Sequence, residues 1–358
     1  MNFSAGPATL PPPVLEEVRR DLVRIPDVGI SPLEISHRSP WFEGVIGEAE
    51  ANIRSLLGVP GEYRVLFLQG GATTQFSMVP MNLAPAGGGA AGYAVTGSWG
   101  AKALAEASRL GPTAARWDGR DEGYVRVPEP EELQTGRGDA YLHITSNETI
   151  HGVEWPGGTE PQVPLLVCDA SSDFLSRPVS VARYGLLYAG AQKNAGPAGV
   201  TVVIVREDLL GRIPDALPRM LDYRTYADHG SRYNTPPVFA IYVLSLVTRW
   251  LRDKGGLAAQ EQRNREKASL LYERIDASDG FYRGHAAPEA RSLMNVTWRL
   301  PSEDLDRRFV AEAAGEGLVE LKGHRSVGGI RASIYNAMPV EGVRALAGFI
   351  DGFSRRNG

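Results

Sequence analysis

The stretch GLLYAGAQKNAGPAGVTVVIV, residues 185–205, decides the fold that this sequence predicts. It holds two short apolar runs, Gly185–Tyr188 and Thr201–Val205, and neither alternates between apolar and polar side chains. Strands of that kind are typically buried on both faces of a sheet. Between the two runs, Lys193 is the only charged side chain of the stretch. The stretch therefore predicts two buried strands with a partly buried lysine between them.

The same pattern continues on the N-terminal side, where short apolar runs alternate with segments of helical periodicity. Further strands are expected at Val65–Leu68, Tyr93–Thr96, Tyr141–Thr145 and Leu165–Cys168. Helices are expected at Trp41–Leu57 and Ala101–Leu110, with a mobile turn at Gly87–Gly89. Helices placed between buried strands predict an α/β fold in which a mostly parallel sheet is covered on both faces.

A second, smaller α/β unit is expected at the C-terminal end. A long helix opens at Pro236–Pro237 and ends at Gly255–Gly256, which fits proline in the first turn and glycine after the last. The elements expected beyond it are a helix at Ala258–Ile275, strands at Met294–Trp298, Leu318–Leu321 and Ile330–Tyr335, and a closing helix from Val340. We therefore expect a large domain with its N-terminal segment over residues 1–256, and a small C-terminal domain over residues 257–358.

Composition narrows the functional classes. Of the 358 residues 43% are hydrophobic and 22% charged, which are ordinary values for a globular protein. The formal net charge of -4 gives no basic footprint for nucleic acid or for an anionic membrane. Cys168 is the only cysteine, which excludes an intramolecular disulfide and a thiolate metal cluster. With neither a signal peptide nor a membrane-spanning run, a cytoplasmic protein without a metal site is expected.

Lys193 is the first candidate for chemistry. Burial disfavours the ammonium form of a lysine, and the neutral amine is the better nucleophile toward an aldehyde. The alternative is a lysine on a loop between strands whose stem packs while its amine reaches solvent.

Asp169 is the second candidate, because it directly follows the apolar run that ends at Cys168. Ligands of open parallel sheets bind at the carboxyl ends of strands, where this carboxylate would project. A carboxylate there could face the ring nitrogen of a bound pyridine cofactor. The alternative is a cap on the following segment, and Cys168 itself is expected to lie in the core.

A third feature is the segment VLFLQGGATTQF, residues 65–76, which predicts a strand, a glycine turn and the start of a helix. Free backbone N–H groups at such a start bind phosphate. Trp99 stands at a similar junction, where an indole could stack on a flat ring or simply pack in the core.

Six motifs together make the chain similar to a known family. They are FSAGPATLP from Phe3, SHRS from Ser36, TSNETIHGV from Thr145, YAGAQKNAGPAGV from Tyr188, YNTPP from Tyr233 and KGHRSVGGIRASIYNAMP from Lys322. The chain resembles the phosphoserine aminotransferases, which are class-V aminotransferases that use pyridoxal 5′-phosphate (PLP). The resemblance implies the PLP-dependent transferase fold of type I, similar to aspartate aminotransferase, with a mostly parallel, seven-stranded sheet in the large domain.

The resemblance also implies roles for individual residues. Lys193 would form the Schiff base and move the proton, Asp169 would face the ring nitrogen, Trp99 would stack on the ring, and Thr149 would bind its 3′ oxygen. The cofactor phosphate would be held by Ala72, Thr73 and Gln192, together with Asn234 and Thr235 of a second subunit. Substrate would be bound by Ser4, His324 and Arg325, by His37 and Arg38 of the partner subunit, and by Arg331, which would hold the substrate carboxylate.

The implied reaction is reversible amino transfer between L-glutamate and 3-phosphohydroxypyruvate in serine biosynthesis, catalysed by a homodimer with composite sites. A related phosphorylated oxo-acid of pyridoxine biosynthesis is an alternative substrate. One position departs from the family, because bacterial members often place an arginine where this chain has Thr73. The grip on the substrate phosphate is therefore expected to depend more on the other cations.

Three alternatives share parts of this pattern. A cysteine desulfurase would need a reactive cysteine on a loop, whereas Cys168 is expected in a strand. A serine–glyoxylate aminotransferase would have no use for the cluster of His37, Arg38, His324 and Arg325. A non-catalytic PLP-binding regulator would need an attached DNA-binding domain, and no helix-turn-helix or basic stretch lies outside the enzyme-like region.

Overall fold

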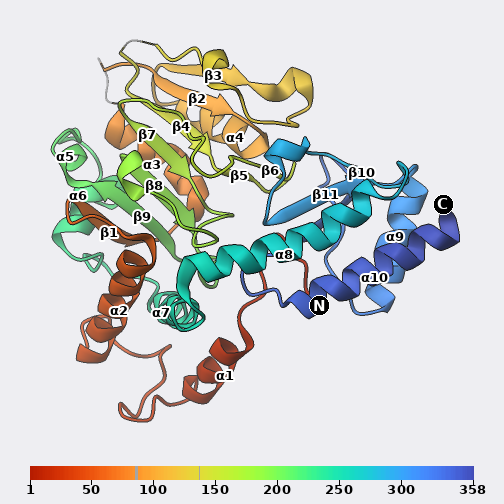
Figure 1. Ribbon diagram of the computed structural model, residues 1–358. Coiled ribbons are helices and arrows are strands. Elements are labelled where there is room, and N and C mark those ends of the chain that lie inside the picture. Colours follow the sequence, from red (N-terminus) through yellow and green to blue (C-terminus); the bar gives the residue numbers. More distant parts are fainter. Residues whose placement is uncertain (85–87, 137) are drawn as a thin grey trace.

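The computed structural model describes residues 1–84, 88–136 and 138–358. Two α/β units of unequal size lie side by side, and the long helix α8 (Gly256–Asp276) extends across both (Figure 1). The expected turn at Gly87–Gly89 begins outside the described residues. None of the helices in the described residues combines the length and the apolar character needed to cross a bilayer.

The larger unit is built on a seven-stranded sheet of order β1-β9-β8-β7-β4-β2-β3. Its strands are β1 (Tyr63–Leu68), β2 (Ala91–Val95), β3 (Thr113–Asp118), β4 (Tyr141–Thr145), β7 (Leu166–Asp169), β8 (Leu186–Gly190) and β9 (Thr201–Arg206). Among these strands β9 alone runs in the opposite direction, so its pairings with β1 and β8 are antiparallel and the other pairings are parallel. The prediction of a mostly parallel sheet is confirmed. The edge strand β3 was not predicted, because its side chains are half-buried or exposed and give little apolar signal.

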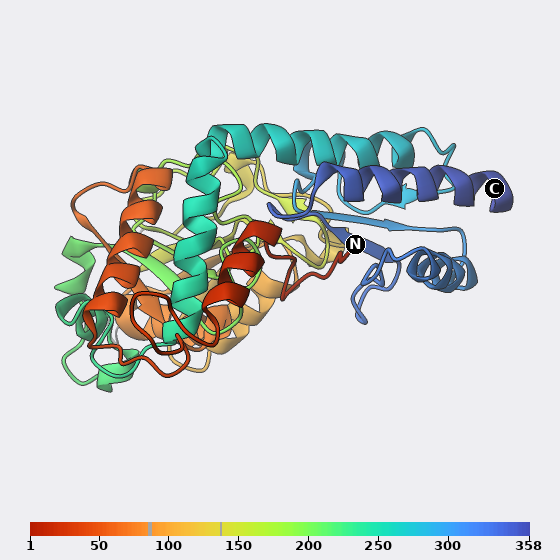
Figure 2. The ribbon, with the colours of Figure 1, turned by 90° about the horizontal axis from the view of Figure 1, so that it is seen from below.

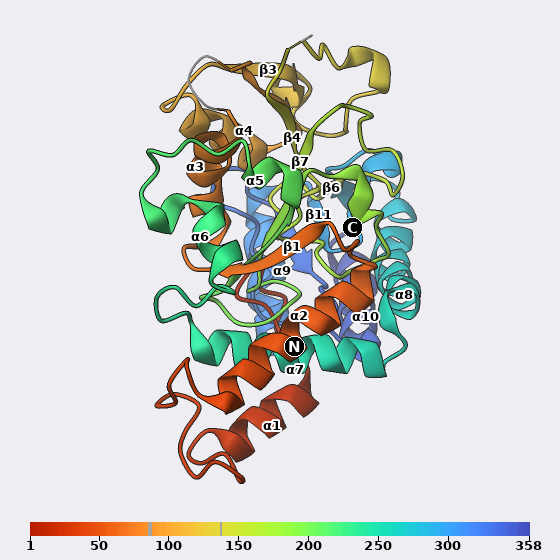
Figure 3. The same ribbon diagram turned by 90° about the vertical axis from the view of Figure 1, so that its left-hand side faces the viewer.

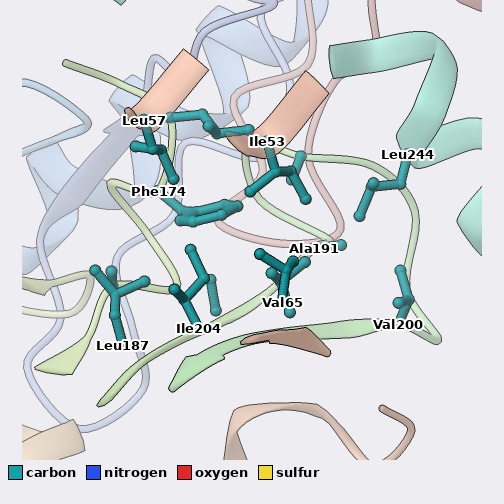
Figure 4. Packing of buried hydrophobic residues seen from close by; sticks show 14 of the residues in the cluster. Ile53, Leu57, Val65, Phe174, Leu187, Ala191, Val200, Ile204 and Leu244 are labelled. Atoms are coloured by element: carbon teal, nitrogen blue, oxygen red, sulfur yellow. The ribbon is translucent and has the colours of Figure 1, made fainter. Parts of the chain in front are cut away.

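Both faces of this sheet are buried, which explains why its strands lack alternation. In β1, Val65 and Phe67 belong to one core, whereas Leu66 and Leu68 belong to another on the opposite face. The first core lies under α2 (Pro40–Leu57) and α7 (Val238–Asp253), and Figure 4 shows part of its packing. The second core lies under α3 (Gly71–Leu83) and α4 (Ser98–Ala107).

The smaller unit contains an antiparallel sheet of order β10-β11-β12. Its elements are β10 (Arg283–Gly284), β11 (Asn295–Arg299), α9 (Glu303–Gly315), β12 (Ile330–Ser333) and α10 (Val340–Asn357). Helices α8 and α10 run side by side over it (Figure 2). Phe309 anchors its core, with ring centroids of Phe349 and Phe353 4.9 and 5.1 Å away. Phe3, from the N-terminal segment, lies in the same core, and the boundary at residue 256 stays a prediction.

One expected strand is wrong. Residues 318–321 form no strand, and only isolated bridges occur there, at Val319 and at the adjoining Lys322. Gly317 and Glu320 have φ angles of 79° and 66°, so the backbone repeatedly leaves the extended conformation that a strand requires. An apolar run alone did not predict these two turns.

The remaining elements connect the two units or lie at the edges. They are α1 (Pro12–Asp21), β5 (Asn147–Glu148), β6 (Val153–Glu154), α5 (Glu207–Leu210), α6 (Tyr223–Asp228) and the short helices η1 (Gly119–Glu122), η2 (Pro130–Glu132), η3 (Val181–Arg183), η4 (Arg219–Leu221) and η5 (Pro288–Ala290). Helix α1 lies on the outer side of α7 (Figure 3). The two-stranded β5–β6 hairpin leaves the carboxyl end of β4, where the candidate site is found.

Candidate active site

Three neighbouring parallel strands, β4, β7 and β8, end at the same edge of the large sheet. Thr145 pairs with Asp169, and Asp169 pairs with Tyr188, so the three strand ends are in register. The lysine loop follows β8 directly, and the segment carrying Thr149 follows β4. Residues that are distant in the sequence therefore meet where open parallel sheets bind ligands.

Lys193 retains some solvent exposure along its side chain, but its amine is surrounded by protein. The Nζ atom donates a hydrogen bond to the Thr149 hydroxyl at 2.7 Å. It also lies 5.6 Å from the centroid of the Trp99 ring. Burial lowers the pKa of Lys193 to about 8, although the nearby Asp169 and Glu148 carboxylates oppose this shift. A large share of the amine is therefore neutral near pH 8, as a nucleophile requires.

Asp169 is buried at the end of β7. One of its carboxylate oxygens accepts a hydrogen bond from the Ser171 N–H at 2.9 Å. Residues 171–175 form turns, so Asp169 caps no α-helix there. Burial raises the pKa of Asp169, while the side chain of Ser171 and the charge of Lys193 oppose the shift. The site thus pairs a buried acid with a buried amine.

The glycine turn before α3 has the backbone shape of a phosphate cradle. Gly70 has a φ of 91°, and an added Cβ would lie only 2.2 Å from the Thr74 hydroxyl, so only glycine fits. No side chain caps the N-terminus of α3. The first N–H groups of the helix, including those of Ala72 and Thr73, remain available for a phosphate. Thr73 is exposed at this turn.

Cationic side chains from the small unit and from α4 of the large unit lie near one another at the site. The Arg331 guanidinium, from β12, donates to the Thr149 carbonyl at 3.5 Å. Burial lowers the pKa of His324, and the charges of Arg331, Lys102 and Arg325 lower it further. In the part of the chain that the structure describes, none of Arg331, Arg325 and Lys102 forms an ion pair with an acid. Unpaired cations that converge in this way indicate an anionic ligand.

Comparison with known proteins identifies the family. Residues 1–346 match the family model described as aminotransferase class-V. The chain is 56% identical to the phosphoserine aminotransferase of Laribacter hongkongensis, over 100% of this chain and 99% of that protein. Among solved structures, the phosphoserine aminotransferase from Bacillus circulans subsp. alkalophilus is 50% identical, with a TM-score of 0.97 over 100% and 99% of the two chains. A PLP-bound phosphoserine aminotransferase from Trichomonas vaginalis is 39% identical, with a TM-score of 0.90 over 98% and 99%.

The chain belongs to the class-V aminotransferases. It is a PLP-dependent transaminase with the expected type I fold. Cys168, which a desulfurase would need on a loop, is fully buried in β7, so that alternative is wrong for this aminotransferase.

The site of this aminotransferase has the groups that PLP requires. The Lys193 amine lies 5.6 Å from the Trp99 ring centroid and close enough to Asp169 for their charges to interact, and Trp99 Nε1 is buried without a hydrogen-bond partner among the described residues. An uncapped helix start supplies N–H groups for the phosphate. Lys193, Asp169, Trp99 and the first turn of α3 therefore fit the cofactor.

The N-terminal segment and the lysine loop complete the wall of the site. An added Cβ at Gly6 would lie 3.5 Å from Lys193 Cγ, so the backbone passes close to the lysine. The Gln192 carbonyl accepts from the Ala8 N–H at 2.8 Å. The Ser4 hydroxyl accepts from the Gly6 N–H at 3.4 Å. The N-terminal segment that carries Ser4 and the loop that carries Gln192 and Lys193 thus lie beside each other. The binding roles of Ser4 and Gln192 stay predictions.

Four predicted site residues are not joined to Lys193 within the single chain. His37 is half-buried, whereas Arg38, Asn234 and Thr235 are exposed. None of their side chains has a hydrogen bond or an ion pair to Lys193, Arg331 or His324 among the described residues. The Thr235 carbonyl accepts from Gln69 at 3.1 Å, beside the glycine turn. Their predicted action in a second subunit stays a prediction.

Two residues that the sequence reasoning missed lie beside Trp99. The Lys102 ammonium lies over the Trp99 ring, 4.1 Å from its centroid. The Glu148 carboxylate accepts from the backbone N–H groups of Trp99 and Gly100. The sequence could have predicted the contact between Lys102 and Trp99, because side chains three residues apart in a helix share one face. Nothing local distinguished Glu148 from an exposed glutamate.

Proposed function

We propose that this aminotransferase transfers an amino group reversibly between L-glutamate and 3-phosphohydroxypyruvate, giving O-phospho-L-serine and 2-oxoglutarate. The observation that supports this most directly is that Thr149 contacts both Lys193 and Arg331. Its hydroxyl accepts from the Lys193 amine at 2.7 Å, and its carbonyl accepts from Arg331 at 3.5 Å. A substrate carboxylate on Arg331 would therefore hold its Cα near the lysine amine.

Each residue of the site has a separate role in the proposed reaction. Bound PLP supplies an electron sink for the amino group in transfer. Lys193 would hold the cofactor covalently and move the proton at the substrate Cα. Asp169 would hold the proton on the cofactor ring nitrogen, and the Thr149 hydroxyl beside Lys193 would bind the 3′ oxygen. The pKa of Lys193, lowered to about 8, suits an amine that must both attack and move protons.

The substrate phosphate would bind to His324 and Arg325, with Arg38 and His37 of the other subunit. A dianionic phosphate needs several fixed donors, and arginine pairs with it bidentately. Arg325 forms no ion pair among the described residues, which supports this role. The positive charges of Arg331, Lys102 and Arg325 near His324 support it as well. Thr73 at the phosphate turn offers only a neutral hydroxyl, so these cations carry most of the recognition.

A two-substrate experiment tests the proposal. Glutamate should change the absorbance of the bound cofactor, and 3-phosphohydroxypyruvate should restore it. Arg331→Lys should raise KM for both substrates, because a point charge replaces a bidentate grip on the carboxylate that they share. Arg325→Ala should raise KM for the phosphorylated substrate far more. Equal effects of both variants on both substrates would contradict the assignment.

A homodimer with composite sites is part of the proposal. The segment before His37 exposes several apolar side chains, among them Val23 at 83% and Leu33 at 64%. A second copy that covered them would remove apolar surface from water. The same contact would bring His37 and Arg38 to the neighbouring site.

Subunit exchange tests the composite site. Lys193→Ala and Arg38→Ala chains, each inactive alone, should recover about a quarter of wild-type activity after random exchange, since half of the dimers then hold one intact site. The double variant Lys193→Ala/Arg38→Ala mixed with either single variant provides the control, because no intact site can form. Exchange without recovery would place Arg38 in the site of its own subunit. The pyridoxine-pathway substrate and the cytoplasmic location stay predictions.

A further inference from the structure

Glu148 is a fully buried acid at the edge of the active site. Its two carboxylate oxygens accept from the N–H of Trp99 at 3.0 Å and from the N–H of Gly100 at 2.8 Å. These N–H groups belong to the first turn of α4, which has no cap from its own N-cap residue, Gly97. Glu148 therefore caps a helix that begins 50 residues earlier in the sequence.

A buried carboxylate without a cation is costly to keep. Glu148 forms no ion pair in the ranges that the structure describes, and burial raises its pKa to about 7. The two backbone donors oppose that shift, as does the charge of Lys193, whereas Asp169 increases it. The N-terminus of α4 also carries partial positive charge. The carboxylate is thus stabilised by the helix that carries Trp99 and by the lysine.

The neighbours of Glu148 bind other parts of the site. The Asn147 side chain donates to Ser172 and to Asn295 of β11, each at 2.8 Å. The Thr149 hydroxyl accepts from Lys193. Three successive side chains therefore reach the turn after Asp169, the helix of Trp99 and the lysine. This arrangement holds the first turn of α4 at a set position relative to Lys193.

We propose that Glu148 is a positioning residue, which fixes the first turn of α4 so that the Trp99 indole lies over the space where the cofactor ring binds. The inference rests on the cofactor role proposed for Trp99. It concerns cofactor binding, not the choice of substrate, so it can fail while the proposed reaction holds. A mere folding role for Glu148 would predict lower stability without a specific link to Trp99.

The first test uses Glu148→Gln, which keeps the size of the side chain but places an NH2 group against a backbone donor. The dissociation constant of PLP should rise about tenfold, the size expected for the loss of a helix cap. Near-UV circular dichroism of the holoenzyme should change as the indole moves. In a Trp99→Ala background the same substitution should change the dissociation constant less than about twofold, because Glu148 then has no ring to position.

Glu154→Gln is the matched control. Glu154 is also a buried acid that accepts from a backbone N–H, that of Leu293 at 2.7 Å, but it pairs with Arg177 at 3.5 Å and has no hydrogen bond to α4 among the described residues. Its substitution should lower the melting temperature and leave the dissociation constant of PLP within about twofold. Equal effects of Glu148→Gln in the wild-type and Trp99→Ala backgrounds would overturn the proposal.

Gly97→Ala gives an independent route to the same displacement. Gly97 has an extended φ of 175°, which alanine adopts without strain, but the new Cβ would lie 2.4 Å from Glu148 Cδ. The carboxylate must then move while its charge is retained. The dissociation constant of PLP should rise by a similar factor in Gly97→Ala. This variant therefore tests the proposal even where Glu148→Gln does not fold. A folded Gly97→Ala protein with wild-type PLP affinity would overturn the proposal.

Discussion

Lys193 and Lys267 are both enclosed by protein, yet their amines have opposite surroundings. The Lys193 amine has one acceptor, the Thr149 hydroxyl at 2.7 Å. The Lys267 side chain is 1% exposed, and its amine donates to the carbonyls of Ile334, Tyr335 and Met338 at 2.8, 2.6 and 3.2 Å. Burial lowers the pKa of both lysines. The difference between them lies in what accepts their hydrogen bonds.

This comparison separates a reactive lysine from a structural one. Three carbonyls satisfy every N–H of the Lys267 ammonium and hold the turn after β12, the strand of Arg331. An amine bound in that way cannot turn toward an aldehyde without leaving the buried carbonyls of Ile334 and Met338 without their donor, whereas the Tyr335 carbonyl also accepts from the Met338 N–H. Among the described residues the Lys193 ammonium has a single protein acceptor, so two of its N–H groups have none. Burial alone therefore does not make a lysine a nucleophile.

The largest expected effect is that of Lys193→Ala. Turnover should fall by at least about 10⁴-fold, because the covalent link and the proton transfer are both lost. PLP should still bind through its phosphate, which separates this loss from a folding defect. Steady-state kinetics with an absorbance check of bound cofactor measures it. A normal transamination rate in this variant would contradict the assignment of Lys193 as the catalytic lysine.

Asp169→Asn should lower kcat by more than about tenfold, or 1.4 kcal/mol, because an amide cannot hold the proton on the cofactor ring nitrogen. It should also lower the pKa of Lys193 below about 8, since the negative charge of Asp169 favours the ammonium form. Lys267 should not respond. A loss of less than tenfold in kcat would argue against the electron-sink role.

Lys267→Met should reduce the free energy of unfolding by about 3 kcal/mol, because three buried carbonyls lose a donor. For protein that remains folded with PLP bound, kcat should stay within about twofold. Urea unfolding measures the first value and kinetics the second. Lys254→Met, at an exposed lysine, is the control and should change neither. A catalytic loss without a loss of stability would contradict the structural role.

The smallest effect concerns pH. The lowered pKa of Lys193 places its neutral form above about pH 8, so the neutral fraction rises about tenfold between pH 7 and pH 9. Acetylation of the PLP-free protein at Lys193, followed by mass spectrometry of peptides, should rise by the same factor. Lys267 should remain unlabelled at both pH values because its amine is covered. Comparable labelling of both lysines would remove the distinction between them.

The sequence reasoning worked best where a local pattern reflects a local environment. The uncharged stretch around Lys193 predicted its burial, and the apolar run before Asp169 placed the acid at a strand end. It failed where the backbone turns without a strong signal, as at Glu320, and on β3, which lies at an edge with few apolar side chains.

The sequence by itself determined the mostly parallel sheet buried on both faces, the order of most of its strands, and the burial of Lys193 between two of them. These follow from the spacing of side chains along short segments, because burial on two faces excludes polar residues from a strand. Only the tertiary structure decided the burial of Lys267, which lies in the charged helix segment NREKASLLYER. It also decided the contact between Glu148 and α4. Both depend on carbonyls or N–H groups about 50 to 70 residues away, and spacing along the chain carries no record of such partners.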